Sequence, residues 1–157
     1  MSLTLVRLDD RLIHGQVVVG WGNALGADQI LLIDDHVAAA QWERDLYCLG
    51  VPPNMDVEFS SVEDAPSRLE QVVESDKRAI VVIADVDTLV RVCRSSDLVR
   101  RVNIGGLHEQ EGRRRRLPYV FLSDAESESL RMLVAEGVEV TARDVPSAKA
   151  VPLAEIL

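Results

Sequence analysis

The chain has 157 residues, of which 47% are hydrophobic and 27% are charged, a composition typical of one globular domain covering residues 1–157. Its formal net charge of −9 argues against a nucleic-acid-binding protein, which needs a basic surface to displace the counterions of phosphates. The sequence has neither an apolar run of membrane-spanning length nor a basic-then-apolar leader, so we expect a soluble, cytoplasmic protein.

Short apolar runs typical of β-strands recur along the chain, with helix-like patterns between them. The runs lie at residues 3–8, 29–33, 57–60, 79–84, 102–104, 119–122 and 138–142. This alternation predicts an α/β fold with an open, mainly parallel β-sheet that is flanked by helices on both faces. In the second and fourth runs the apolar residues follow one another without alternation, which indicates central strands.

The first helix is predicted over residues 15–25. Its apolar residues recur on one face of a helix, and Gly26 is a natural stop because glycine readily adopts the left-handed conformation of a helix end. The residues of this apolar stripe are Val17, Val18, Trp21 and Leu25.

Capping and stop signals predict the other helices. One covers about residues 38–48, because the two prolines that follow it cannot continue a helix. The tetrapeptide SSVE has the pattern of a capping box that opens a helix at about residue 62, and SDAE at 123–126 has the same pattern. A helix over residues 86–96 completes the set.

Residues 105–117 form the longest polar stretch without a predicted regular element. A functional loop and a surface excursion would both account for it. The stretch contains four consecutive arginines at 113–116. A solvated loop is the favoured interpretation of this run, and the alternative hypothesis is that it steers an acidic partner toward a chain of negative net charge.

Polar residues and glycines collect just past the predicted strands, where ligands bind in open α/β sheets. These residues are Asp9, Asp10, Arg11 and His14 after the first strand, Asp34, Asp35 and His36 after the second, Asp85 and Asp87 after the fourth, and Gly105 and Gly106 after the fifth. The carboxyl ends of parallel strands meet at one edge of a sheet, so the sequence predicts a ligand site at that edge.

His14 is the candidate for chemistry at this site. It lies between a strand end and a helix start, where backbone N–H groups and the helix dipole favour an anion. Arg11 can reach the same volume and hold a phosphate with a planar fork of donors, and Gly15 lets the backbone approach closely. A neutral imidazole is a competent nucleophile near pH 7, so the group suggests a histidine that receives a phosphoryl group.

Asp9 and Asp10 have two interpretations. Either carboxylate could orient the ring of His14 by accepting one of its N–H groups, which leaves the other nitrogen free to attack. Either could equally cap the helix or pair with Arg7 or Arg11, and capping or pairing is slightly favoured.

The remaining glycines and histidines carry weaker signals. Gly105 and Gly106 either turn the chain after the fifth strand or form part of the floor of a phosphate site. His36 and His108 have no convincing set of partners, so a surface role is expected for both.

No metal or other cofactor is predicted. Cys48 and Cys93 fall in predicted helices without metal-ligand spacing and are expected to be buried, reduced thiols. Clustered aspartates can bind Mg²⁺, as in the receiver domains of response regulators, but that fold needs a lysine at the end of a late strand. Lys77 and Lys149, the two lysines of the chain, are not well placed for this role, so the receiver interpretation is a distant alternative.

The stretch RLDDRLIHGQVVVGW at residues 7–21 closely resembles the phosphorylation-site segment of the IIB components of the mannose/fructose/sorbose family of the bacterial sugar phosphotransferase system (PTS). The segments DDHVAA, VPPNMDVEF, VNIGGLH and LPYVFLS, in this order, resemble further segments of that family. The resemblance covers nearly the whole chain.

The resemblance implies that His14 accepts a phosphoryl group from a IIA phosphohistidine and passes it to a sugar bound at the membrane components IIC and IID. It matches Arg11 to the phosphate-site loop and Gly105–Gly106 to the facing loop, and it implies an open, mainly parallel sheet and no cofactor. The protein would then be cytoplasmic and peripherally associated with the transporter, and a homo-oligomer is allowed. Because the chain begins at the first strand, the IIA donor is expected to be a separate protein.

Two alternatives stay open. A regulatory phosphocarrier would use the same chemistry at His14 to control another protein, without sugar transport. An anion- or nucleotide-binding module would use the same helix start and Gly105–Gly106, with His14 only as a hydrogen-bond donor. Acid-labile phosphate on His14 would exclude the second alternative.

Overall fold

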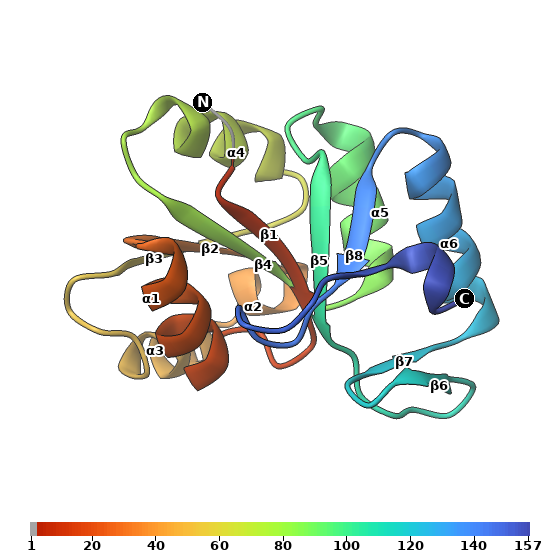
Figure 1. Ribbon diagram of the computed structural model, residues 1–157. Coiled ribbons are helices and arrows are strands. Elements are labelled where there is room, and N and C mark those ends of the chain that lie inside the picture. The colour runs from red at the N-terminus through yellow and green to blue at the C-terminus, as the bar shows by residue number, and fades with distance from the viewer. Residues whose placement is uncertain (1–2) are drawn as a thin grey trace.

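The computed structural model describes residues 3–157 as an α/β fold around one seven-stranded sheet (Figure 1). The strand order is β3-β2-β4-β1-β5-β8-β9, and β9 is the antiparallel member. The strands are β1 (Leu5–Asp9), β2 (Gln29–Ile33), β3 (Asp56–Ser60), β4 (Ala79–Ile83), β5 (Arg101–Gly106), β8 (Glu139–Ala142) and β9 (Val151–Pro152). The predicted fold class, an open and mainly parallel sheet, is confirmed.

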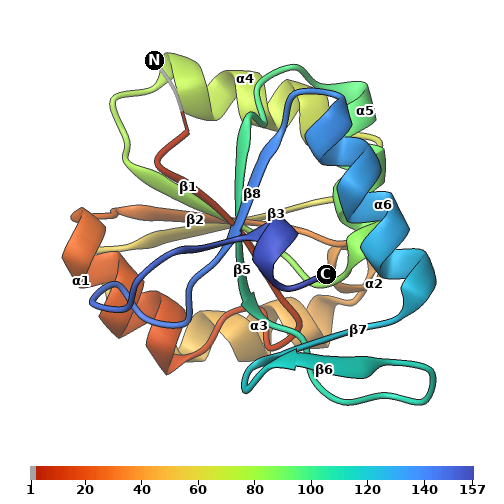
Figure 2. The same ribbon diagram turned by 45° about the vertical axis from the view of Figure 1, so that its right-hand side comes forward.

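Helices cover both faces of the sheet. On one face α4, α5 and α6 pack against β1, β4 and β5, and on the other face η1 and α2 pack against β2 and β4 (Figure 2). The helices are η1 (Gln16–Trp21), α1 (Gly22–Leu25), α2 (Asp35–Ala39), α3 (Gln41–Leu49), α4 (Ala65–Glu74), α5 (Val86–Ser95), α6 (Asp124–Ala135) and the 3₁₀ turn η2 (Leu153–Glu155). None of these helices is long and apolar enough to cross a membrane.

The central position of β2 and β4 is confirmed. Every residue of both strands is buried, because β2 lies between β3 and β4, and β4 lies between β2 and β1. Their consecutive apolar residues face a helical layer on each side. β1 lies between β4 and β5, so its carboxyl end is flanked by strands on both sides.

Two predicted helices differ from the structure. The one at 15–25 is a π-helix, η1, continued by α1, and it ends as expected at Gly26 in the left-handed conformation (φ +61°). The one at 38–48 is two helices, α2 and α3, because Ala40 between them is extended (φ −112°, ψ 97°). Asp34, which caps α2 by accepting from the N–H of Val37, starts this region earlier than predicted.

One of the two predicted capping boxes is correct. In SDAE, the Ser123 hydroxyl accepts from the N–H of Glu126, whose carboxylate accepts from the N–H of Ser123, and α6 begins there. In SSVE, Ser61 accepts instead from the N–H of Asp64, and α4 begins only at Ala65. The second serine of the tetrapeptide makes the turn, so the predicted box does not form.

The predicted irregular segment at 105–117 is partly regular. Its first two residues belong to β5, and its last four form β6 (Arg114–Leu117), which pairs antiparallel with β7 (Val120–Leu122). The run at 119–122, expected in the parallel sheet, lies in this separate hairpin instead. A bridge between Leu107 and Val120 attaches the hairpin to the end of the main sheet.

The prediction that both cysteines are buried holds only in part. Cys48 is exposed on α3, contrary to expectation, whereas Cys93 is partly buried and its burial raises the pKa of its thiol to about 11. Because no residue of helix α3 is buried, the thiol of Cys48 lies at the surface.

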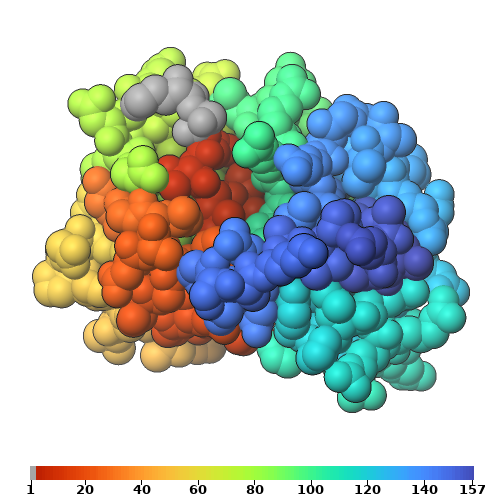
Figure 3. Space-filling view, viewed as in Figure 1, coloured from red at the N-terminus to blue at the C-terminus, as the bar shows by residue number. Residues whose placement is uncertain are grey.

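The segment between β8 and β9 crosses in front of the sheet, as the blue band in Figure 3 shows. It covers the lower parts of β1 and β5 and leaves a hollow above them (Figure 3). This crossing brings residues 143 and 144 to the carboxyl end of β1, where the site forms.

Replacing Ser123 with Ala should lower the free energy of unfolding by about 0.5–2 kcal/mol, because the first turn of α6 loses its cap. Ser129→Ala is the matched control in the interior of the same helix, and it should stay within about 0.5 kcal/mol of the original protein. Urea unfolding followed by circular dichroism measures both. Equal stabilities of the two variants would show that the box contributes nothing.

Candidate functional site

The site lies where β1 ends and the chain turns into η1. Asp9 is the last residue of β1, and the pairing of β1 with β5 shifts register at this point. The N–H of Asp10 then donates to the carbonyl of Gly106 at 2.9 Å. Leu12, buried in the turn, has φ +59°, the one positive φ of a non-glycine residue within 3–157. The turn is therefore held in a strained conformation by its burial and its hydrogen bonds.

Asp9 is the centre of the site, and its side chain is fully buried. Arg11 binds it with a two-point contact, from Nε to Oδ1 at 3.0 Å and from Nη2 to Oδ2 at 2.9 Å. His14 Nε2 lies 3.3 Å from Oδ2. Burial alone would raise the pKa of the Asp9 carboxyl, but the hydrogen bonds from His14 and Arg11 hold it well below its usual range. Asp9 is therefore ionised.

The ionised carboxylate determines which nitrogen of His14 carries the proton. Asp9 can only accept, so Nε2 donates to it, and the lone pair stays on Nδ1. The N–H of Gln16 points to Nδ1 at 3.3 Å, and the next two N–H groups, of Val17 and Val18, bind the His14 carbonyl. The ring is 19% exposed. These contacts make Nδ1 the ring nitrogen that carries no proton.

A second arginine, Arg7, supports Asp9 from inside the sheet, and its side chain is fully buried. Its Nε lies 3.3 Å from Asp9 Oδ2. Its Nη1 donates to Asn103 Oδ1 at 2.5 Å and to the carbonyl of Arg143 at 3.0 Å. Its Nη2 donates to the carbonyl of Asp144 at 2.9 Å. The guanidinium thus ties the end of β1 to β5 and to the segment that crosses the sheet.

The ring of Trp21 lies close to two guanidinium groups. The Cζ of Arg7 is 5.0 Å from the ring centroid and that of Arg143 is 5.6 Å from it, both within cation–π range. Trp21 Nε1 donates to the carbonyl of Asp144 at 3.2 Å. Helix η1 is therefore joined to the same network as β1.

Gly105 and Gly106 make room for the arginines. Both lie within β5, so the interpretation of the pair as a turn is wrong. A Cβ on Gly105 would lie 2.1 Å from Cζ of Arg7, and one on Gly106 would lie 3.0 Å from Nη2 of Arg11. The pair forms the surface against which the guanidinium groups lie. Gly15 differs, because a Cβ there would meet nothing within 4 Å.

Asp10 points away from His14 and holds the loop after β5. Its carboxylate accepts from the N–H of His108 at 2.8 Å and lies 2.5 Å from Nδ1 of that ring. His108 and His36 are both exposed, as expected, but contrary to expectation each has a carboxylate partner, Asp10 for His108 and Glu43 for His36. Of the two adjacent carboxylates, Asp9 orients His14 and Asp10 anchors the neighbouring loop.

The four arginines are not one solvated loop. Arg113 is 7% exposed and makes a two-point contact with Glu126, and Arg116 is 15% exposed. Arg114 is 69% exposed and pairs with Asp124 at 2.5 Å. Arg113 is structural, and the exposed charge of the run lies on the two central arginines.

The acids after the other strands do not join the site. Asp34 and Asp85 cap α2 and α5, through the N–H groups of Val37 and Thr88. Within residues 3–157 no group of three or more His, Cys, Asp or Glu side chains could hold a metal ion.

Several residues of the site escaped the sequence reasoning. Arg7 is considered in the sequence only as a possible partner of Asp9 or Asp10, although a charged residue inside an apolar strand already indicates a buried partner. Gln16 and Trp21 lie close to His14 in the predicted first helix, but nothing there indicates their hydrogen bonds. Asn103, Arg143 and Asp144 come from distant parts of the chain and carried no signal.

Comparisons with known proteins agree with this architecture. The model of the PTS system sorbose subfamily IIB component matches residues 3–157. The chain is 28% identical to the N-acetylgalactosamine-specific phosphotransferase enzyme IIB component 2 of Escherichia coli, covering 99% of both. It is 24% identical to the fructose-specific EIIB component of Bacillus subtilis, covering 100% of this chain and 96% of the relative.

The crystal structure of the IIBSor domain of the sorbose permease from Klebsiella pneumoniae superposes with a TM-score of 0.89 and 29% identity. The superposition covers 99% of this chain and 96% of that one. The chain therefore belongs to the sorbose subfamily of PTS IIB components, the phosphotransferases that carry a phosphoryl group in sugar uptake.

Proposed function

We propose that His14 is the phosphoryl acceptor of this IIB component and that the group is carried on Nδ1. The proposal rests on one observation: the buried, ionised Asp9 holds Nε2 of His14 and leaves Nδ1 as the nucleophile. The donor is the phosphohistidine of a IIA protein. The acceptor is a sugar at the membrane components IIC and IID, in the range of fructose and N-acetylgalactosamine that the relatives' names cover.

The transfer to His14 needs no proton movement. The Nδ1 lone pair attacks phosphorus, the N–P bond of the donor breaks, and the donor ring leaves as neutral imidazole. The His14 ring keeps its Nε2 proton and becomes cationic, and the carboxylate of Asp9 stabilises that charge. In the second transfer a sugar hydroxyl attacks phosphorus, its proton passes to a base outside this chain, and His14 returns to its neutral form.

Arg11 is the residue suited to the phosphoryl oxygens. Its Nε and Nη2 bind Asp9, its side chain is 34% exposed, and Nη1 has no hydrogen bond within residues 3–157. The space beside Gly15 is open, and the N–H of Gln16 can move from Nδ1 to a phosphoryl oxygen. Phosphoryl transfer depends mainly on positioning and charge stabilisation, which these groups supply.

Replacing His14 with Ala should abolish labelling by a phosphorylated IIA protein, because no other imidazole within residues 3–157 faces Asp9. The label on the original protein should be acid-labile and base-stable, and it should leave when membranes with IIC and IID and their sugar are added. His108→Ala is the control and should be labelled normally. Undiminished labelling of the His14 variant would overturn the proposal, and labelling without sugar-dependent loss would favour the regulatory phosphocarrier.

Replacing Arg11 with Lys should slow phosphoryl transfer at saturating donor by at least about tenfold, because lysine keeps the charge but loses the fork that bridges Asp9 and the phosphoryl group. Rapid-quench kinetics measure the rate. Arg91→Lys, in a surface pair with Asp35, is the matched control and should behave as the original protein. A rate equal to that of the control would restrict Arg11 to a structural role.

Replacing Asp9 with Asn should lower the free energy of unfolding at pH 7 by about 3–5 kcal/mol, because Arg7 is left buried beside a neutral amide. In the original protein the folded-state pKa of Asp9 is depressed. Its contribution is therefore present above the unfolded-state pKa of about 3.9 and is lost as pH falls through the folded value.

Urea unfolding between pH 3 and pH 7 tests this expectation. The stability of the original protein should fall below about pH 4, and the Asp9→Asn variant should show a weaker fall. Asp10→Asn is the control and should lose less at pH 7, since Arg113 keeps Glu126 as a partner. An Asp9→Asn variant with the original stability and the original pH dependence would contradict the assigned role of Asp9.

A further inference from the structure

A cavity of about 580 Å³ lies over part of the sheet, away from the carboxyl end of β1 that carries the proposed phosphorylation site. It is formed by the amino-terminal halves of β1, β5 and β8, in the hollow that Figure 3 shows above the crossing segment. Its volume is in the range of small-molecule sites. Nothing in the proposed transfer to His14 uses it.

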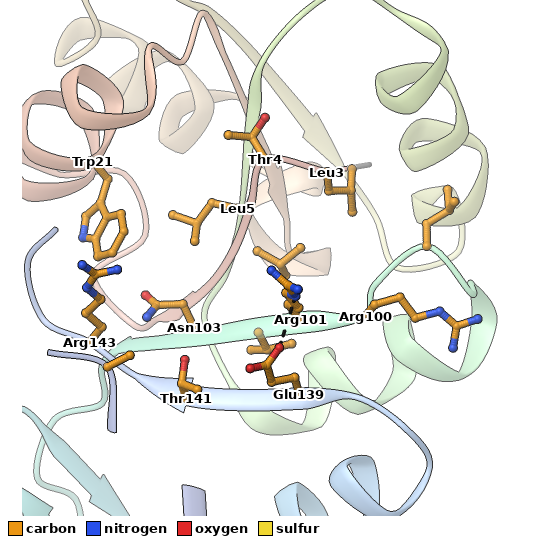
Figure 4. A pocket seen from close by; sticks show the side chains of 14 residues that line it. Leu3, Thr4, Leu5, Trp21, Arg100, Arg101, Asn103, Glu139, Thr141 and Arg143 are labelled. Carbon is orange, nitrogen blue, oxygen red and sulfur yellow. Dashed lines mark ion pairs between the residues drawn. The ribbon is translucent and has the colours of Figure 1, made fainter. Parts of the chain in front are cut away.

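The cavity is cationic in a chain of net charge −9. Three arginines and one glutamate line it. Arg101 pairs with Glu139 at 3.2 Å, and the guanidinium of Arg100 has no ion pair within residues 3–157. Figure 4 shows Arg143 beside Trp21 on one side and Arg101 beside Glu139 on the other, whereas the guanidinium of Arg100 extends away from the other lining side chains. A surplus of positive charge in a concave site favours an anionic ligand.

The middle of the cavity offers hydrogen-bonding groups and an apolar wall. Asn103 and Thr141 lie between the two charged ends, opposite Leu5 (Figure 4). Within residues 3–157 the Asn103 side chain makes one hydrogen bond, through Oδ1 to Arg7, and the Thr141 hydroxyl makes none. The NH₂ group of Asn103 and the hydroxyl of Thr141 therefore suit hydroxyl groups of a ligand.

The length of the cavity sets the size of the ligand. The N–H of Arg143 donates to the carbonyl of Ile104, three residues along β5 from Arg101. At the rise of a β-strand this separation is about 10 Å. A molecule of this length with a doubly charged phosphate at one end, hydroxyl groups in the middle and a C–H face fits the lining, because arginine binds phosphate with a fork of donors. A phosphorylated hexose has these features.

We propose that this cavity binds a phosphorylated sugar and that its occupancy alters phosphoryl transfer at His14. The identity of the ligand rests on the proposed function, because a sugar phosphate is the product of the transfer that His14 feeds. The cavity and His14 would be connected through Asn103 and Arg143, which line the cavity and also accept hydrogen bonds from Arg7. Arg7 in turn lies against Asp9, the carboxylate that orients His14.

Binding is tested with N-acetylgalactosamine 6-phosphate and fructose 6-phosphate, with the free sugars and inorganic phosphate as comparison ligands. Calorimetry measures the affinity. Fluorescence of a Trp42→Phe variant, in which Trp21 is the remaining tryptophan, reports whether the ligand lies in the cavity. A sugar phosphate should bind at least about tenfold more tightly than either comparison ligand and should change the Trp21 emission.

The double variant Arg100→Ser/Arg101→Ser should lose at least about tenfold in affinity and keep the basal transfer rate, because both residues lie away from His14. Arg91→Ser/Arg131→Ser, which removes two exposed arginines elsewhere, is the matched control and should bind normally. Unchanged affinity of the first double variant, no binding at all, or equal binding of inorganic phosphate would each overturn the proposed site.

The coupling is measured as the rate of His14 labelling with and without the sugar phosphate. The rate should change at least about twofold in the original protein and stay constant in the Arg100→Ser/Arg101→Ser variant. A constant rate in the original protein would overturn the coupling. Failure of His14 labelling itself would contradict the proposed function, and the binding titration, which needs no transfer, would separate the two failures.

Discussion

The buried carboxylate of Asp9 is the constraint on which the rest of the site depends. It is placed at the end of a central strand, where removal from water would be unfavourable for a lone charge. Arg7, within β1, and Arg11, in the turn after it, supply the opposite charge, and His14 supplies a further hydrogen bond. The same contacts keep the carboxylate ionised. Because an ionised carboxylate can only accept a hydrogen bond, Nε2 is the protonated nitrogen of the imidazole. One buried group thus connects the stability of the strand end with the chemistry of the ring.

Burying the partner of Asp9, the guanidinium of Arg7, places requirements on more distant parts of the fold. A buried guanidinium needs several acceptors, and Arg7 finds them in Asn103 and in the carbonyls of residues 143 and 144. Because Gly105 has no side chain, the guanidinium can lie against β5. The segment that crosses the sheet is therefore part of the site although it lies far from it in the sequence. Two of these residues, Asn103 and Arg143, also line the cavity, which is the physical basis for the proposed coupling between the cavity and His14.

Two adjacent aspartates have separate tasks because successive residues at a strand end point in different directions. Asp9 faces the sheet and the imidazole, whereas Asp10 faces the loop after β5 and holds His108 and Arg113. Arg113 also donates to the carboxylate of Glu126, which belongs to the capping box of α6. The hairpin and α6 are thereby attached to the turn that carries His14, and that turn retains its strained Leu12.

The sequence by itself determined the alternation of strands and helices, the central place of β2 and β4, the capping box of α6 and the candidate residues His14 and Arg11. Each of these depends on neighbours a few residues apart, so local periodicity and spacing express it. The break at Ala40, the hairpin and the role of the two glycines were decided only by tertiary structure. The same holds for the choice of Asp9 over Asp10. Its reason is physical: the partners of Asp9 and Arg7 include residues about a hundred positions away, and only the packing of β1 against β5 and the crossing segment brings them together.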